Sequence, residues 1–140
     1  GNRIFGCDDC LAICPWNKFA KKYSDLKLKF IKKLNLPSLE MFLNFEEYNY
    51  RSYFAGTPIR RLGYDRFMRN VLIAAANSKN PTLTNSVLRQ LDSNSDIIRA
   101  MAVWALFCLS KSRFFLEKSK RFNSEQIFEV KQEWLNGEKK

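Results

Sequence analysis

The stretch DIIRAMAVWALFCL, residues 96–109, decides the fold, because it is apolar on almost every side of a helix. Such a helix has no face suited to water, so we expect other helices to surround it. Residues 64–76 and 81–91 repeat apolar residues at helical spacing and predict a helix pair before it. No stretch shows the alternation typical of a strand. The sequence therefore predicts a mainly α fold of antiparallel, HEAT-like helix pairs, with an irregular helical bundle as the alternative.

Three further expectations concern individual helices. Asn44, with a glutamate three residues later, has the spacing of a capping box and predicts a helix start. Asn123 is expected to cap the last helix. On the central helix, Trp104 and Cys108 are one turn apart, so we expect both side chains in the core.

The composition divides the chain into three parts. Residues 1–20 hold three closely spaced cysteines and indicate a partial [4Fe–4S] ferredoxin-type segment. Residues 21–56 form a lysine-rich connector followed by short helices. Residues 57–137 are expected to form the HEAT-like helical domain.

The cysteines Cys7, Cys10 and Cys14 follow the pattern Cys-x2-Cys-x3-Cys-Pro, which matches the end of a bacterial-type ferredoxin motif. In two-cluster ferredoxins the cysteine before proline serves the other cluster, so Cys7 and Cys10 would share one cluster and Cys14 would reach a second. A [4Fe–4S] cluster normally takes four thiolates, and Cys108 is expected in the core. We therefore expect the missing ligands upstream in a longer protein. A structural zinc site and inert thiols are the alternatives.

The charge balance points to a polyanionic partner. The chain has 24 Lys+Arg against 14 Asp+Glu, a net charge of +10, and no histidine. The missing histidine excludes Ser-His-Asp and Cys-His nucleophiles and His-containing zinc sites. The positive excess is concentrated at residues 17–33 and 51–79, which favours a binding face. With no apolar stretch near the ~20 residues of a membrane span and no signal peptide, we expect a protein that binds no membrane. The three close cysteines fit a reducing cytoplasm, and we expect a monomer.

One basic stretch concentrates four arginines around a single acid, Asp65. They are Arg60, Arg61, Arg66 and Arg69. Guanidinium groups bind phosphate through two parallel hydrogen bonds, Gly56 and Gly63 permit close backbone approach, and Tyr64 could stack on a base. We therefore predict that these arginines bind RNA phosphates. A solvated basic face is the alternative.

These residues resemble the C-terminal region of the epoxyqueuosine reductase family. GNRIFGCDDC at 1–10, followed by CPWN at 14–17, is similar to that family's second cluster motif. Further similar segments lead into and through its HEAT-like helices: TPIRR at 57–61, RFMRN at 66–70, NS at 77–78, DIIR at 96–99 and AVWAL at 102–106.

The resemblance implies an oxidoreductase that reduces epoxyqueuosine to queuosine in the tRNA anticodon loop, the last step of queuosine synthesis. It also implies a base-off cobalamin and two [4Fe–4S] clusters, with electrons passing through the clusters to cobalt. By motif, Cys7 and Cys10 would ligate the second cluster and Cys14 the first. The resemblance strengthens the expectation that the four arginines hold the tRNA backbone.

The family's N-terminal cobalamin domain, with its catalytic acid and its first four-cysteine motif, has no counterpart in this sequence. We therefore expect no catalytic residue in the chain and neither reductase activity nor a stable cubane from the chain alone. It would supply cluster ligands and a tRNA-binding face to an upstream catalytic domain of the same protein. The alternative is a stand-alone basic helical RNA-binding module with a vestigial or zinc-binding cysteine motif.

Overall fold

The computed structural model describes residues 3–19 and 37–138. It divides into two units, Gly6–Pro37 and a larger one made of Gly1–Phe5 with Ser38–Lys140. The predictions made for residues 21–36 of the lysine-rich connector lie outside the described residues.

The smaller unit carries two short helical elements, α1 (Asp9–Ala12) and the 3₁₀ helix η1 (Pro15–Phe19). Asp8, just before α1, has a left-handed backbone with φ of 53°, a conformation that aspartate tolerates better than most residues. Pro15 suits the start of η1, because its fixed φ is helical and the N–H it lacks would be unpaired there. Cys10 therefore lies within α1, and Cys14 directly precedes η1.

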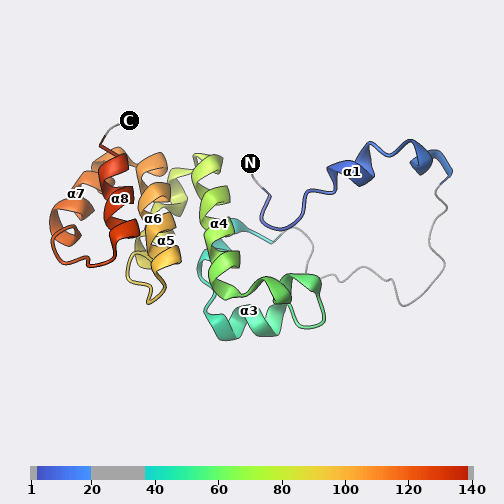
Figure 1. Ribbon diagram of the computed structural model, residues 1–140, viewed down its shortest axis with the longest axis horizontal. Coiled ribbons are helices and arrows are strands. Elements are labelled where there is room, and N and C mark those ends of the chain that lie inside the picture. The colour runs from blue at the N-terminus through green and yellow to red at the C-terminus, as the bar shows by residue number, and fades with distance from the viewer. Residues whose placement is uncertain (1–2, 20–36, 139–140) are drawn as a thin grey trace. The chain divides into compact units, whose positions relative to one another are not determined.

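Among its described residues the larger unit has helices and no strands, which confirms the predicted mainly α fold. Figure 1 shows α4, α5, α6 and α8 next to one another, and contacts join α6 to each of the other three. In chain order the elements are α2 (Leu39–Leu43), α3 (Glu47–Tyr53), η4 (Pro58–Leu62), α4 (Tyr64–Ser78), η5 (Pro81–Leu83), α5 (Thr84–Gln90), α6 (Asp96–Leu109), α7 (Lys111–Arg121) and α8 (Phe128–Asn136).

Helix α6 is the centre of the larger unit, as its apolar composition predicts. It packs against α4, α5, α7 and α8. Each large aliphatic side chain that becomes fully buried contributes about 1.5–3 kcal/mol. The buried residues of α6 are Ile98, Ala102, Val103, Ala105 and Leu106.

No helix within the described ranges combines the length and apolarity needed to cross a bilayer.

The expectation that Trp104 and Cys108 lie in the core is wrong. Cys108 is exposed and Trp104 is only partly buried. Both share one side of α6 with Ile97 and Met101, because residues four, seven and eleven positions apart lie on the same helix face. Ile97, at the start of that side, is 44% exposed. An apolar sequence indicates which helix is central, but it does not show which side the neighbouring helices leave open.

Two predicted helix starts are also wrong. Asn44 ends α2, and Glu46 is the residue that precedes α3. The Asn44 side chain accepts a hydrogen bond from Arg89 of α5, so tertiary structure uses the group that would have capped a helix. Ahead of α8, the carboxylate of Glu125, not the side chain of Asn123, accepts hydrogen bonds from two backbone N–H groups.

A cluster of aromatic rings joins α2, α3 and α4. The ring centroid of Phe67 in α4 lies 5.2 Å from Phe42, 5.0 Å from Tyr50 and 5.1 Å from Phe54. All four side chains are buried. Aromatic pairs at such distances contribute about 0.5–1.5 kcal/mol beyond the area that they bury. The cluster therefore fixes α3 against the helix that carries two of the candidate arginines.

Candidate nucleic-acid interface and cysteine segment

The four arginines predicted to bind RNA lie on consecutive elements of the larger unit. Arg60 and Arg61 belong to η4, and Arg66 and Arg69 to the first turns of α4. All four residues are exposed. Phe67, between them in sequence, is 1% exposed and points into the aromatic cluster, as predicted. We call this group of four arginines the arginine face.

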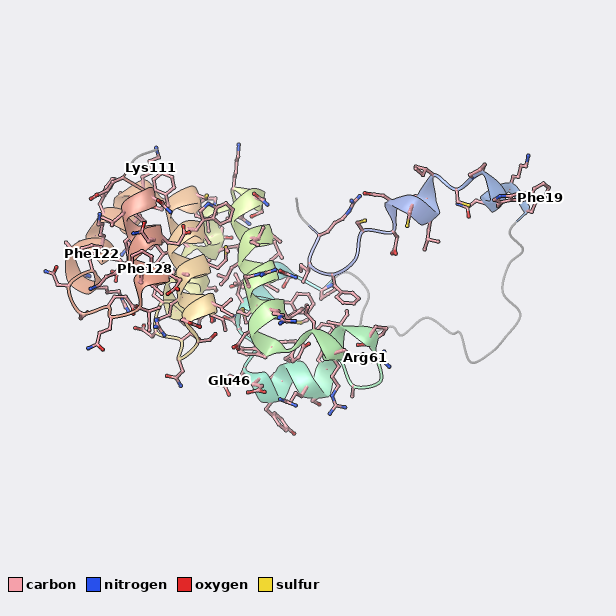
Figure 2. The ribbon with its side chains drawn as sticks, viewed as in Figure 1. Phe19, Glu46, Arg61, Lys111, Phe122 and Phe128 are labelled. Carbon is pink, nitrogen blue, oxygen red and sulfur yellow. The ribbon has the colours of Figure 1, made fainter. Side chains whose placement is uncertain are left out.

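None of the ion pairs recorded among the described residues neutralises the arginine face. Figure 2 shows Arg61 and Glu46 at opposite ends of α3. Asp65, the acid closest in sequence, accepts a hydrogen bond from the Ser95 hydroxyl at 2.9 Å. Arg69 contacts the neutral amide oxygen of Asn70 at 3.3 and 3.2 Å. By contrast, the paired basic residues of the described chain lie elsewhere: Arg51, Arg99, Lys118, Lys120 and Arg121.

A hollow of about 550 Å³ adjoins the arginine face. Gly63 has a φ of 84° and Gly56, which lines the hollow, has a φ of 76°. Glycine adopts such positive angles without steric cost. A Cβ at either glycine would meet nothing within 4 Å, so a ligand could approach the backbone there. The hollow is lined by Gly56, Thr57, Pro58, Arg60 and Arg61.

Two tyrosine hydroxyls fix η4 and the start of α4. Tyr50 donates to the carbonyl of Ile59 at 2.6 Å, and Tyr64 donates to the carbonyl of Phe45 at 2.7 Å. Burial raises the pKa of both phenols, so both remain protonated donors at neutral pH. The ring of Tyr64 packs edge-on against Tyr50. Its hydroxyl and ring thus have structural roles, while base stacking by Tyr64 stays a prediction.

We expect Tyr50→Phe to lower the free energy of unfolding by about 1 kcal/mol, because the Ile59 carbonyl loses its donor. Urea unfolding measures the change. Tyr48→Phe is the matched control, since Tyr48 is 78% exposed. It should change the free energy of unfolding by less than about 0.5 kcal/mol. Equal midpoints for the two variants would show that the hydrogen bond does not stabilise η4.

The three cysteines of the ferredoxin-type spacing are free thiols in the smaller unit. Cys7 and Cys10 are exposed and Cys14 is partly buried. Among the described residues, the structure gathers no group of three metal-ligating side chains. Thiolates are the donors that iron–sulfur clusters take, but three are fewer than a cubane needs. The residue type therefore fits a cluster while this arrangement does not form a complete site, and ligation stays a prediction.

A second charged group, which the sequence does not single out, connects the C-terminal elements. Arg99 of α6 pairs with Glu125 at 3.1 Å, and Arg121 of α7 pairs with Glu117 at 2.9 Å and with Asp92. Both arginines line a cavity of about 260 Å³ beside α8. Carboxylates neutralise both guanidinium groups, so these ion pairs hold the helices together. The described residues that line the cavity therefore offer no unpaired positive charge to an anion. Arg99 is 26 residues from Glu125, and Arg121 is 29 residues from Asp92. No local sequence spacing therefore predicts these two ion pairs.

The pH dependence of stability should report on Glu117. A hydrogen bond from Arg121, assisted by Lys120, lowers the pKa of Glu117 despite its burial. Such a carboxylate stabilises the fold above its unfolded pKa, and this stabilisation is lost as pH falls through the folded pKa. We therefore expect the free energy of unfolding to decline below about pH 4.5, and Glu117→Gln to flatten that decline.

Urea unfolding between pH 7 and pH 3 tests this expectation. Glu129→Gln is the control, because Glu129 is exposed at the first turn of α8. Parallel curves for the wild type and Glu117→Gln would remove Glu117 from the acid response.

Comparisons with known proteins show which proteins the chain resembles. No family model matches the chain. An epoxyqueuosine reductase from Xanthomonas campestris is 36% identical over 110 residues, which are 76% of this chain and 30% of that protein. The chain is homologous to one part of the epoxyqueuosine reductases. The Escherichia coli epoxyqueuosine reductase is 30% identical over 106 residues, 76% of this chain and 28% of that protein. The chain thus spans less than a third of the length of these relatives.

Solved epoxyqueuosine reductase structures share the fold. One matches with a TM-score of 0.87 and 24% identity over 98% of this chain and 37% of its own. A second, with the same values, is a crystal structure of epoxyqueuosine reductase with an epoxyqueuosine-modified tRNA-Tyr stem-loop. A third comes from Bacillus subtilis. The resemblance inferred from the cysteine and arginine motifs is confirmed, and the relatives are oxidoreductases by name.

Proposed function

We propose that this chain is the RNA-binding and cluster-ligand part of an enzyme that reduces epoxyqueuosine to queuosine in a tRNA anticodon loop. The observation that carries the proposal is the unneutralised arginine face in a chain homologous to part of the epoxyqueuosine reductases. An RNA backbone presents phosphates in series, and guanidinium groups bind phosphate bidentately. The arginine face therefore suits a tRNA stem-loop, and we place the protein in the cytoplasm.

Within this proposal, residues of the chain bind and orient the RNA. Arg60 and Arg61 hold phosphates from a turn that Tyr50 fixes, and Arg66 and Arg69 extend the contact along α4. The hollow beside Gly56 lets the RNA backbone come close to the protein. We assign no catalytic residue to this chain, and the reduction itself belongs to an upstream domain of the same protein.

The proposed cofactors are two [4Fe–4S] clusters and a cobalamin. Cys7 and Cys10 would hold one cluster and Cys14 the other, each completed by thiolates outside the chain. Once bound, the clusters and cobalamin would carry electrons from an external reductant to the epoxide. The cobalamin belongs to the upstream domain, and no residue of this chain is assigned to it.

Binding of an unmodified tRNA-Tyr anticodon stem-loop, followed by fluorescence anisotropy between 50 and 300 mM KCl, tests the RNA-binding function. Each phosphate contact should contribute about 0.7–0.9 to the slope of log affinity against log salt, so we expect a slope of about −2 to −4. A chain that fails to bind, or binds without salt dependence, would refute the proposal.

We expect the isolated chain to show no turnover of epoxyqueuosine-containing tRNA, because no catalytic residue is assigned to it. Anaerobic reconstitution should likewise leave less than one complete cubane per chain. Nucleoside analysis after incubation with reductant, and iron and sulfide determination, are the measurements. Conversion to queuosine by the chain alone would contradict the assignment of catalysis to another domain.

One observation favours a second candidate, a stand-alone RNA-binding module whose cysteines bind zinc or nothing. Cys7 and Cys10 are exposed, and no group of three ligands is gathered in the described ranges. Metal analysis of the full-length protein separates the two: iron with acid-labile sulfide supports the reductase, and stoichiometric zinc without sulfide supports the module.

A further inference from the structure

The side-chain amide of Asn70 in α4 makes two contacts that the proposed function leaves unexplained. Its Nδ2 donates to the backbone carbonyl of Ile4 at 2.8 Å, across 66 residues of chain. Its Oδ1 accepts from Nε and Nη2 of Arg69, at 3.3 and 3.2 Å. Asn70 is partly buried between these groups. One amide group therefore connects the N-terminal segment to a member of the arginine face.

The N-terminal segment leads directly to the cysteines. Ile4 is partly buried and stands three residues before Cys7. Residues 3–5 belong to the larger unit and lie outside its helices. The bond from Asn70 to the Ile4 carbonyl therefore holds this segment on α4, directly ahead of the cysteine motif in the sequence.

An amide at position 70 suits Arg69 in a way that a carboxylate would not. The amide oxygen accepts a hydrogen bond and orients the guanidinium group, but it carries no formal charge. An aspartate would accept the same bonds and also neutralise Arg69, which would then compete poorly for phosphate. Asparagine therefore positions the guanidinium group while leaving its charge available.

We propose that Asn70 is a positioning residue that joins the arginine face to the segment entering the cysteines. Its NH₂ group holds the chain before Cys7 against α4, and its oxygen orients Arg69 toward RNA. The second role rests on the proposed RNA-binding function, whereas the first does not.

Chymotrypsin cleavage after Phe5 tests the first role, because the segment must leave α4 to enter the protease. Asn70→Asp and Asn70→Ala both remove the donor to Ile4, and a net hydrogen bond of about 0.5–1.5 kcal/mol corresponds to roughly two- to tenfold faster cleavage. Mass spectrometry compares this cut with the one after exposed Phe19. Asn85→Asp, on the exposed side of α5, is the charge-matched control and should leave both rates unchanged.

Stem-loop binding tests the second role with the same variants. Asn70→Asp should reduce the salt slope by about 0.7–0.9, the share of one phosphate contact, because Arg69 becomes neutralised. Asn70→Ala should keep the wild-type slope, since the charge of Arg69 is untouched, but should bind the stem-loop roughly two- to tenfold more weakly, because Arg69 loses the acceptor that orients it. A merely structural role for Asn70 would leave the stem-loop affinity of Asn70→Ala unchanged. Circular dichroism checks that each remains helical; if Asn70→Asp does not, Asn70→Ala still reports the cleavage rate.

Each outcome decides one role. Unchanged cleavage after Phe5 in both Asn70 variants would overturn the anchoring of the segment. Wild-type stem-loop affinity in Asn70→Ala, or a wild-type salt slope in Asn70→Asp, would overturn the orientation of Arg69. If the wild type binds no RNA, the proposed function and the second role fail together, while the cleavage rates still decide the first.

Discussion

Reversing Arg60 and Arg66 together, as Arg60→Glu with Arg66→Glu, is expected to weaken stem-loop binding by about a hundredfold or more. Hydrogen bonds to charged groups contribute roughly 1.5–3 kcal/mol each, and each reversal also introduces repulsion from phosphate. Both residues are exposed and outside the recorded ion pairs, so folding should be little affected. The slope of log affinity against log salt should fall by about 1.5, the share of two phosphate contacts.

The matched control for this reversal is Arg113→Glu on α7, an exposed arginine outside the arginine face. It makes the same charge change per substitution but should leave the salt slope nearly unchanged. An unchanged slope in the double variant would remove Arg60 and Arg66 from the interface. A slope that falls equally in both would indicate a general effect of net charge without a defined face.

Replacing Phe67 by alanine should have the largest effect on stability. Phe67 is 1% exposed and packs against Phe42, Tyr50 and Phe54. Buried Phe→Ala substitutions lose transfer free energy and leave a cavity, which together lower the free energy of unfolding by about 3–5 kcal/mol. Urea unfolding measures this loss. Because the same cluster holds Tyr50 beneath η4, we also expect weaker stem-loop binding under conditions where the variant remains folded.

Phe128→Ala is the control for the core variant, since Phe128 is 67% exposed at the first residue of α8. It should change the free energy of unfolding by no more than about 0.5 kcal/mol. A Phe67→Ala variant that unfolds at the same urea concentration as Phe128→Ala would show that the aromatic cluster does not hold α3 and α4 together.

Apolar composition and helical spacing predicted the central helices. Residues 96–109 are helical from Asp96 to Leu109, and the helix expected over 64–76 extends two residues further, to Ser78. The direction of Phe67 followed from the same spacing, and with it the exposure of the neighbouring arginines. These elements could be predicted because their own side chains carry the pattern that packing requires.

Features that depend on partners distant in sequence could not be predicted. Asn44 has capping-box spacing, yet its side chain accepts a hydrogen bond from Arg89 and does not cap α3. Trp104 and Cys108 lie on an apolar helix, yet the neighbouring helices cover its other sides. Helix α7 was not predicted at all, because only Phe114 and Glu117 of its eleven residues are buried. Its position depends on ion pairs with residues far along the chain.

The candidate site shows the same division. The arginine face was predicted from charge and spacing, and the structure confirms its exposure. Its support by the Tyr50 and Asn70 side chains was not predicted, because those bonds reach backbone carbonyls and leave no pattern in the sequence. The cysteine spacing led to the proteins that the comparisons identify as relatives, whereas ligation by Cys7, Cys10 and Cys14 stays a prediction.

The bond between Asn70 and Ile4 has a consequence for the order of folding. Contacts of α6 with α5 and α7 join neighbours in the chain, and such local contacts form early because little loop entropy is lost. Closing the bond from Asn70 to Ile4 spans 66 residues and loses more, by about 0.6 kcal/mol for each doubling of loop length. We therefore expect the helices to assemble outward from α6 and the N-terminal segment to dock last. By the same reasoning residues 3–5 detach first on unfolding, before the helical unit melts.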